Sequence, residues 1–389
     1  MAAAAAAIKS LLTPANKKYG LIVLACIFLL FIGFHALQYL IFYTRVHRAT
    51  PYMTSKYVAS STVLEEDKKT ITWMIHMYPP AHNAGAEWMA HAMNKSLIEN
   101  DGYKVNVILN SAPVNDFERV HIINKNSRQL VDNTLLHSSV LLSHLDMETN
   151  AVQTALKAKR PLVSVMHNNF RKHLIGEYRR ILPKNFYIIH NSLWLQEYYS
   201  HFNIPSIVVY PPVYWKEYNT PTSREFVTLV NVNANKGGQI LINIAKAMPD
   251  IQFAGVKGGY DGQIIKEGIP NLTYMENTSY IKNIYAKTDI LIVPSAEETW
   301  GRVAIEAMSS GIPVIAHPTP GLLESCGSAG IFCDRGDTAA WVREIRRLKN
   351  DEAWREEVSQ RCLARAKELD PAPQLKKLAT WLKGLEWRE

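Results

Sequence analysis

Two glutamates and the residues between them form the sharpest chemical feature of this chain. Glu298 and Glu306 are eight positions apart, in a segment that predicts a buried strand over 289–294, a loop, and a helix from about Gly301 to just before Gly311. Unpaired amides at a helix start favour anions such as a diphosphate. A carboxylate on each side of that point can accept hydrogen bonds from hydroxyls. The arrangement therefore suits a nucleotide diphosphate sugar, with one glutamate on the sugar and the other on the ribose.

A lysine lies in an earlier strand-to-helix turn. Residues 226–231 predict a strand, and a helix is expected to follow through Ala247. Lys236 stands between them, next to Gly237 and Gly238. A cation in such a turn can neutralise a diphosphate, and the charge of its leaving group, without a metal ion. A solvated turn lysine is the alternative.

Two further strands, expected over 140–143 and 162–166, each lead into a histidine, His144 and His167 respectively. Ligands of open α/β sheets bind at the carboxyl ends of the strands. A histidine at either position is therefore within reach of a substrate, although a strand-end histidine is also common as a structural, hydrogen-bonded residue.

The chain as a whole alternates predicted strands and helices, a pattern typical of α/β domains with parallel sheets. Its 389 residues, 47% hydrophobic and 20% charged, describe a globular protein with room for two such domains. The predicted organisation is an N-terminal Rossmann-like domain over 71–210, an interdomain linker over 211–225, a second Rossmann-like domain over 226–365, and a C-terminal helical tail over 366–389.

The N-terminal region differs from the rest. After a tail of residues 1–19, residues 20–43 contain no Lys, Arg, Asp or Glu. At about 1.5 Å per residue a helix of this length exceeds the hydrocarbon core of about 30 Å, so we expect a transmembrane helix. A signal peptide or a buried helix is the alternative. Residues 44–70 are polar and mixed, which predicts a linker or stalk.

The cysteines and the net charge bear on compartment and partners. Three of the four cysteines lie outside the predicted span and show neither a disulfide framework nor metal-ligand spacing, which favours the cytoplasmic side of the membrane over the lumen. The net charge of +8 comes from scattered residues, so it favours a lipid surface or a generally basic surface over nucleic acid.

The segment PSAEETWGRVAIEAMSSGIPVIA, residues 294–316, resembles the E-x7-E signature of the family 4 retaining glycosyltransferases. The resemblance covers about 71–350 and is strongest over 226–325. It implies the GT-B fold, in which two Rossmann-like domains face each other across a cleft. It also implies transfer of a sugar from a nucleotide diphosphate donor to a glycan or lipid-linked hydroxyl acceptor, with retained anomeric configuration.

The resemblance also implies roles for individual residues. Glu298 would hold the transferring sugar, Glu306 the ribose, and Lys236 the diphosphate. His167, in PLVSVMHNNF, matches the family histidine that faces the sugar, so we prefer it to His144. Thr299, Trp300 and Gly301 match the positions whose backbone amides bind the donor. Gly85 matches a loop that meets the acceptor or a phosphate.

The chain departs from the family at one point. Asn231 and Asn233 stand where an arginine is expected beside Lys236, which indicates weaker phosphate binding or a contribution from another cation such as Lys257. No paired acidic site is present for a metal ion, so we expect neither a metal nor a cofactor. A sugar-nucleotide epimerase and a non-catalytic membrane protein that binds sugar nucleotides remain as alternatives.

Overall fold

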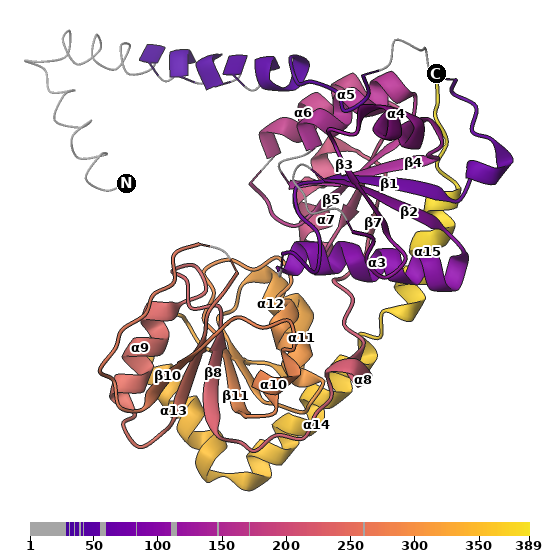
Figure 1. Ribbon diagram of the computed structural model, residues 1–389. Coiled ribbons are helices and arrows are strands. Elements are labelled where there is room, and N and C mark those ends of the chain that lie inside the picture. The colour runs from indigo at the N-terminus through magenta and orange to yellow at the C-terminus, as the bar shows by residue number, and fades with distance from the viewer. Residues whose placement is uncertain are drawn as a thin grey trace, which may run out of the picture.

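The computed structural model describes residues 29–389 apart from 31, 35, 39, 42, 55–59, 83, 110–114, 146–147, 171 and 260. These residues form two α/β domains joined side by side (Figure 1). The first contains a seven-stranded sheet of order β3-β2-β1-β4-β5-β6-β7, and the second a six-stranded sheet of order β10-β9-β8-β11-β12-β13. Every strand pair in both sheets is parallel.

The strands of the first sheet are buried on both faces. In β1, Ile71 and Trp73 join one hydrophobic cluster while Met74 joins the cluster on the opposite side. Such strands read as continuous apolar runs because helices cover both faces of a parallel sheet. The elements of this domain are β1 (Thr70–Ile75), α3 (Gly85–Asp101), β2 (Lys104–Leu109), β3 (His121–Asn124), α4 (Arg128–Leu136), β4 (Val140–His144), α5 (Glu148–Ala158), β5 (Leu162–Met166), α6 (Lys172–Ile181), β6 (Phe186–His190), α7 (Leu193–Tyr199) and β7 (Ser206–Val208).

The second domain repeats this architecture around a single large cluster. A short helix, α8 (Trp215–Tyr218), lies in the segment that connects the two domains. The elements that follow are β8 (Phe226–Val230), α9 (Gly238–Ala247), β9 (Phe253–Val256), β10 (Leu272–Met275), α10 (Lys282–Tyr285), β11 (Thr288–Val293), α11 (Arg302–Met308), β12 (Val314–Ala316), α12 (Pro320–Cys326), β13 (Ile331–Phe332), α13 (Thr338–Asn350) and α14 (Glu352–Glu368).

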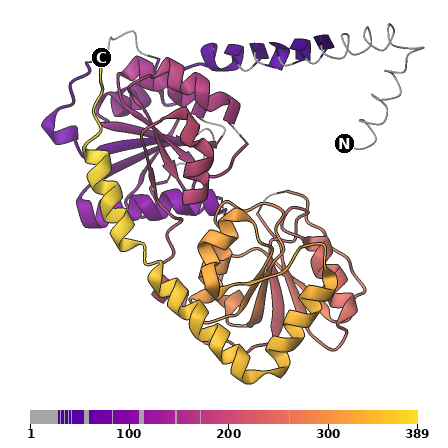
Figure 2. The same ribbon diagram turned by 180° about the vertical axis from the view of Figure 1, so that it is seen from behind.

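The C-terminal helix α15 (Ala372–Lys383) belongs to the first domain in space. Leu375, Leu378 and Leu382 are buried in the same cluster as Trp73, and the hydroxyl of Tyr103 donates to the carbonyl of Ala379 over 3.0 Å. The chain thus leaves the second domain at the end of α14 and returns to the domain that precedes it in sequence (Figure 2). The boundary predicted between residues 365 and 366 falls inside α14, which continues until Glu368.

The segment expected to be a linker, 44–70, is partly packed. Val46 and Met53 are buried in a cluster with residues of α4 and α5. The backbone amide of Tyr52 donates to Thr154 Oγ1 over 2.8 Å, and that of Thr54 donates to Asp132 Oδ1 over 2.7 Å. Two buried apolar side chains and these hydrogen bonds therefore dock the first part of the segment on the first domain.

The predicted transmembrane helix lies mostly outside the described residues, which begin at Leu29 and omit 31, 35, 39 and 42. The described residues between 29 and 47 are helical, and this segment projects away from both domains (Figure 1). Its large apolar side chains between Leu29 and Tyr43 are exposed, with Leu30 at 73%. Within the described part of the chain, no helix has both the length and the apolar character needed to cross a membrane.

Candidate functional site

A cavity of about 650 Å³ lies between the two domains. The first domain contributes Ala84, Gly85 and Trp88, at the start of α3, and the second contributes residues that follow the ends of β8, β9, β10 and β11. The carboxyl ends of parallel strands are the usual ligand-binding edge of such sheets. The volume is within the range of small-molecule sites, about 300–1,000 Å³.

The turn after β8 is built to present Lys236. The side-chain carbonyl of Asn233 accepts from the Lys236 amide over 2.8 Å, and Asn231 Oδ1 accepts from the Asn233 amide over 3.2 Å. Gly237 follows with a φ of +96°, where a Cβ would lie 2.6 Å from Pro294. The two asparagines that replace an expected arginine therefore shape the turn, and glycine is required beside the lysine.

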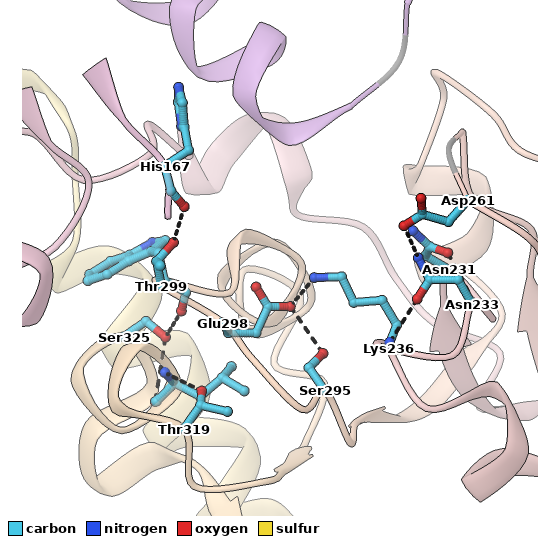
Figure 3. A network of polar contacts seen from close by, with 12 residues as sticks. His167, Asn231, Asn233, Lys236, Asp261, Ser295, Glu298, Thr299, Thr319 and Ser325 are labelled. Carbon is cyan, nitrogen blue, oxygen red and sulfur yellow. Dashed lines mark hydrogen bonds and ion pairs between the residues drawn. The ribbon is translucent and has the colours of Figure 1, made fainter. Parts of the chain in front are cut away.

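Lys236 and Glu298 form an ion pair across the cavity wall (Figure 3). Glu298 Oε1 also accepts from the Ser295 hydroxyl over 3.1 Å. Both charged side chains are largely buried, at 19% and 13% exposed. The turn after β8 and the loop after β11 thus meet through opposite charges, and each charge compensates the other.

The loop after β11 also touches the first domain. The Thr299 hydroxyl donates to the carbonyl of His167 over 2.7 Å (Figure 3). Asn191 Nδ2 donates to Thr299 Oγ1 over 2.8 Å. The Trp300 ring stacks on Tyr210 with centroids 4.0 Å apart. The structure therefore places Thr299 and Trp300 at the contact between the domains and not on the cavity wall.

Two glycines allow the loop after β11 to pack closely against α12. Gly301 has a φ of +91°, and a Cβ there would lie 2.4 Å from a side-chain carbon of Leu322. At Gly321, at the start of α12, a Cβ would lie 2.2 Å from the carbonyl carbon of Thr299. Helix α12 can approach the loop this closely only because both positions lack a side chain. Gly301, like Thr299 and Trp300, does not line the cavity.

Glu306 lines the cavity but is engaged by neighbouring side chains. Arg302 Nε donates to its Oε1 over 2.7 Å, and the Tyr285 hydroxyl donates to its Oε2 over 2.8 Å. Burial, and then Glu306, hold the pKa of Tyr285 well above its ordinary value. The glutamate is therefore preorganised, with its remaining lone pairs available to a ligand hydroxyl.

Arg302 is a site residue that the sequence analysis missed. It lines the cavity, and its Nη2 donates to the Tyr218 hydroxyl over 2.6 Å. Burial alone would lower the pKa of its guanidinium, but Tyr218 and Glu306 raise it above the ordinary value. Its Nη1 is buried without a hydrogen-bond partner among the described residues. Lys257, expected as a substitute cation, also lines the cavity and pairs with Glu276.

His167 lies above Thr299 with its ring directed away from Glu298 (Figure 3). Its Nε2 is 3.1 Å from Nδ1 of His144, so the structure brings the two candidate histidines together. Burial lowers the pKa of His167 to about 4. Its backbone carbonyl, and not its ring, contacts the loop after β11. Gly85 does line the cavity, and a Cβ at this position would meet no atom within 4 Å.

The buried histidine at the end of β6, His190, predicts a pH dependence of the free energy of unfolding. Burial lowers the pKa of His190 to about 4, so the folded protein holds it neutral while the unfolded chain protonates it below about 6.5. Its contribution is complete above pH 6.5 and is lost as the pH falls to 4, by roughly 3 kcal/mol. Between pH 6.5 and 4, the stability measured by urea denaturation should fall less in His190→Phe than in wild type, with the part due to His167 remaining, whereas His201→Ala, at an exposed position, should match wild type. Equal slopes in all three proteins would contradict the assignment.

Comparisons with known proteins agree with this architecture. Residues 257–368 match the family described as "Glycosyl transferases group 1". The chain is 28% identical over 134 residues to the sulfoquinovosyl transferase SQD2 of Arabidopsis thaliana, covering 32% of this chain and 26% of that one. It is 36% identical over 85 residues to the O-antigen chain mannosyltransferase B of Escherichia coli, covering 22% of each. The matches thus span about a quarter of the length of these relatives.

Solved structures resemble nearly the whole two-domain body. Sucrose-phosphate synthase from Thermosynechococcus elongatus has a TM-score of 0.68 at 17% identity, covering 81% of this chain and 98% of that one. HepE from Anabaena, in complex with UDP-glucose, has a TM-score of 0.66 at 16% identity, covering 80% and 98%. The prediction of a GT-B-like fold with two parallel sheets is confirmed.

Proposed function

We propose that this protein is a glycosyltransferase that moves a sugar from a nucleotide diphosphate sugar to a hydroxyl acceptor. The observation that carries the proposal is the Lys236–Glu298 pair on an interdomain cavity that also presents Glu306. Much of this wall falls within or beside the residues that match the group 1 glycosyl transferases. The relatives named above are transferases, so the epimerase and the non-catalytic binding protein are not favoured.

The donor would bind by exchanging partners. Lys236 turns from Glu298 to the diphosphate, and the released carboxylate of Glu298 accepts hydrogen bonds from hydroxyls of the sugar. Glu306 receives the ribose, held in place by Arg302. The cations Lys257 and Arg302, on the same wall, add to the attraction for a dianionic group. Donor binding thus breaks one ion pair and makes another, and the sugar hydroxyls replace Lys236 as partners of Glu298.

The reaction would retain the anomeric configuration. Departure of the nucleotide and attack by the acceptor occur on the same face of the sugar, with the His167 backbone region, which touches Thr299, next to the reacting carbon. Lys236 stabilises the departing diphosphate. The amides of Thr299–Gly301 stay a predicted contact of the diphosphate.

A screen of nucleotide sugars tests the function. The purified chain is incubated with UDP-, GDP- and ADP-linked sugars, with and without glycan and lipid-linked acceptors, and the products are separated. Release of nucleoside diphosphate that is stimulated by one acceptor class, with an α-linked product from an α-linked donor, supports the proposal. Conversion of the donor to its epimer without any acceptor contradicts it.

Transfer should not need Mg²⁺ or Mn²⁺, because Lys236 supplies the positive charge that such an ion would bring to the diphosphate. We expect that, after treatment with a strong chelator, the initial rate does not depend on added Mg²⁺ or Mn²⁺. A matched reaction with added Mg²⁺ or Mn²⁺ is the control. Loss of activity that Mn²⁺ or Mg²⁺ restores, and Zn²⁺ does not, would refute this part of the mechanism.

The N-terminal segment is proposed to anchor the enzyme to a membrane, and a lipid-linked acceptor would then be close to the cavity. The exposed apolar side chains between Leu29 and Tyr43 support this role. Deleting residues 1–43 should release the protein from the membrane fraction and leave its melting temperature unchanged. Deleting 1–55 should lower the melting temperature, because Val46 and Met53 are buried in the first domain. Equal melting temperatures for the two deletions would contradict this division.

A further inference from the structure

The carboxyl edge of the first sheet gathers several metal-ligating side chains. His76 directly follows β1, His144 ends β4, and Glu87 lies in the first turn of α3. One potential ligand atom from each lies within 4.8 Å of the other two. We propose that His76, Glu87 and His144 bind a divalent transition-metal ion of the zinc class, with His82 as the fourth ligand. Metal binding here is separate from the donor site and does not rest on the proposed function.

The distances fit a small ion. Glu87 Oε1 is 3.5 Å from His82 Nδ1 and 3.8 Å from His76 Nε2. Both separations are longer than a hydrogen bond. Two ligand atoms at about 2.0–2.2 Å from a tetrahedral zinc ion are about 3.3–3.6 Å apart. A shift of a few tenths of an ångström therefore brings the Glu87 oxygen and either histidine nitrogen to ligand spacing. His82 joins the group of His76, Glu87 and His144 only if its side chain moves further.

Burial and charge favour a cation at this point. Glu87 is 2% exposed and His144 is fully buried. A buried carboxylate is costly unless a positive charge compensates it. The Nδ1 atom of His82, which faces Glu87, is buried without a hydrogen-bond partner among the described residues. The side chains of His76 and His82 are partly exposed, at 29% and 22%, so an ion can reach the site from solvent.

The ligand set selects the class of ion. Imidazole nitrogens suit Zn²⁺ and its neighbours, whereas Mg²⁺ and Ca²⁺ prefer oxygen. A metal-bound histidine usually donates its second ring N–H to an acceptor, which fixes the tautomer. His144 Nδ1 lies 3.1 Å from His167 Nε2, so His167 is placed to be that acceptor. The metal site would then orient the candidate active-site histidine.

Metal binding also has a consequence for the cavity. His76 and His82 lie on the segment between β1 and α3, and Glu87 is on α3 itself. Gly85 and Trp88, on the same segment, line the cavity. An ion that ties this segment to β4 would fix the first-domain wall of the cavity.

Cobalt binding tests the proposal. The purified full chain is stripped with a chelator, dialysed, and titrated with Co²⁺ and then Zn²⁺. We expect one Co²⁺ per chain, visible d–d bands of tetrahedral cobalt, and displacement by Zn²⁺. Glu87→Gln should weaken binding by at least about 100-fold, since even outer-shell partners contribute about 10- to 100-fold. His121→Ala is the matched control, because His121 is an exposed histidine paired with Asp116 on β3.

A second variant, His82→Ala, keeps the proposal testable if Glu87→Gln does not fold. His82→Ala changes a loop residue that is 22% exposed and should remove the tetrahedral bands and weaken the binding while the melting temperature of the metal-free protein stays near that of wild type. The proposal is overturned if the wild-type chain gives no d–d bands. It is also overturned if folded Glu87→Gln and His82→Ala proteins bind Co²⁺ as tightly as wild type, which would place the ion elsewhere.

Discussion

Replacing Glu298 with Gln should lower kcat for sugar transfer by about 10²-fold or more, which is the scale of losing one preorganised polar contact in a transition state. In the proposed mechanism the carboxylate touches the sugar, where charge develops as the glycosidic bond breaks. An interaction that strengthens only in the transition state affects kcat. Affinity for the free nucleoside diphosphate should not fall, because Lys236 loses its competing partner. Steady-state kinetics and calorimetry measure the two effects.

Glu306→Gln is the matched control for this prediction. Glu306 lies on the same wall but is expected to meet the ribose, away from the reacting bond. Its loss should weaken binding of free nucleotide by about 1–3 kcal/mol, the cost of leaving a buried polar group unsatisfied, with a smaller effect on kcat. If free nucleotide loses affinity only in the Glu298 variant, the two roles are reversed. If both variants keep full activity, neither carboxylate acts in the reaction.

The fold could be predicted from local patterns because the central strands of these sheets are buried on both faces. Residues 290–294 are apolar and residues 162–166 are apolar except for Ser164, and the structure has strands at Thr288–Val293 and Leu162–Met166. Helix ends also have local signals. Helix α11 ends shortly before Gly311, whose φ of +67° favours glycine. These signals are contained within a few residues, so a single sequence carries them.

Packing between distant segments carried no such signal. The pattern of residues 44–70 predicted a linker, yet Val46 and Met53 are buried against α4 and α5. Nothing local to Val46 distinguishes an apolar residue that is docked from one that is exposed. Likewise, the return of α15 to the first domain depends on Leu375 and Leu378 meeting a face of α3 and its sheet, which their own helix period does not specify.

The site residues could also be predicted where the signal is local, whereas their contacts with distant residues could not. Lys236 and Glu298 were found because each lies in a strand-to-helix loop whose strand and glycines are recognisable in sequence. Their direct contact was not expected, since 62 positions separate them. The engagement of Glu306 by Tyr285, and the gathering of histidines around Glu87, were missed for the same reason. Each of these contacts brings together side chains from different elements, and the spacing of residues along the chain does not predict such contacts.

Breaking the buried contact between Arg302 and Glu306 should have a large effect on stability. Arg302→Met should lower the free energy of unfolding of the second domain by about 3–5 kcal/mol, the usual cost of breaking a buried ion pair by removing one partner. Arg302 and Glu306 are 14% and 9% exposed, so removal of the guanidinium leaves a largely buried carboxylate uncompensated. Tyr218 loses its donor at the same time. Methionine keeps most of the side-chain volume, so the change reports charge and hydrogen bonding more than a cavity. Chemical denaturation measures the loss.

Two further proteins separate the ion pair from other effects of the substitution. Arg343→Met breaks a pair with Glu344 on α13 in which the arginine is 67% exposed, and it should cost no more than about 1 kcal/mol. In the double variant, Glu306→Gln removes the carboxylate that Arg302→Met leaves uncompensated, so its loss of stability should be smaller than the sum of the two single losses. Additive losses would show that the two side chains do not stabilise each other. Arg302 would then act only through Tyr218, and the preorganisation of Glu306 would have to come from Tyr285 alone.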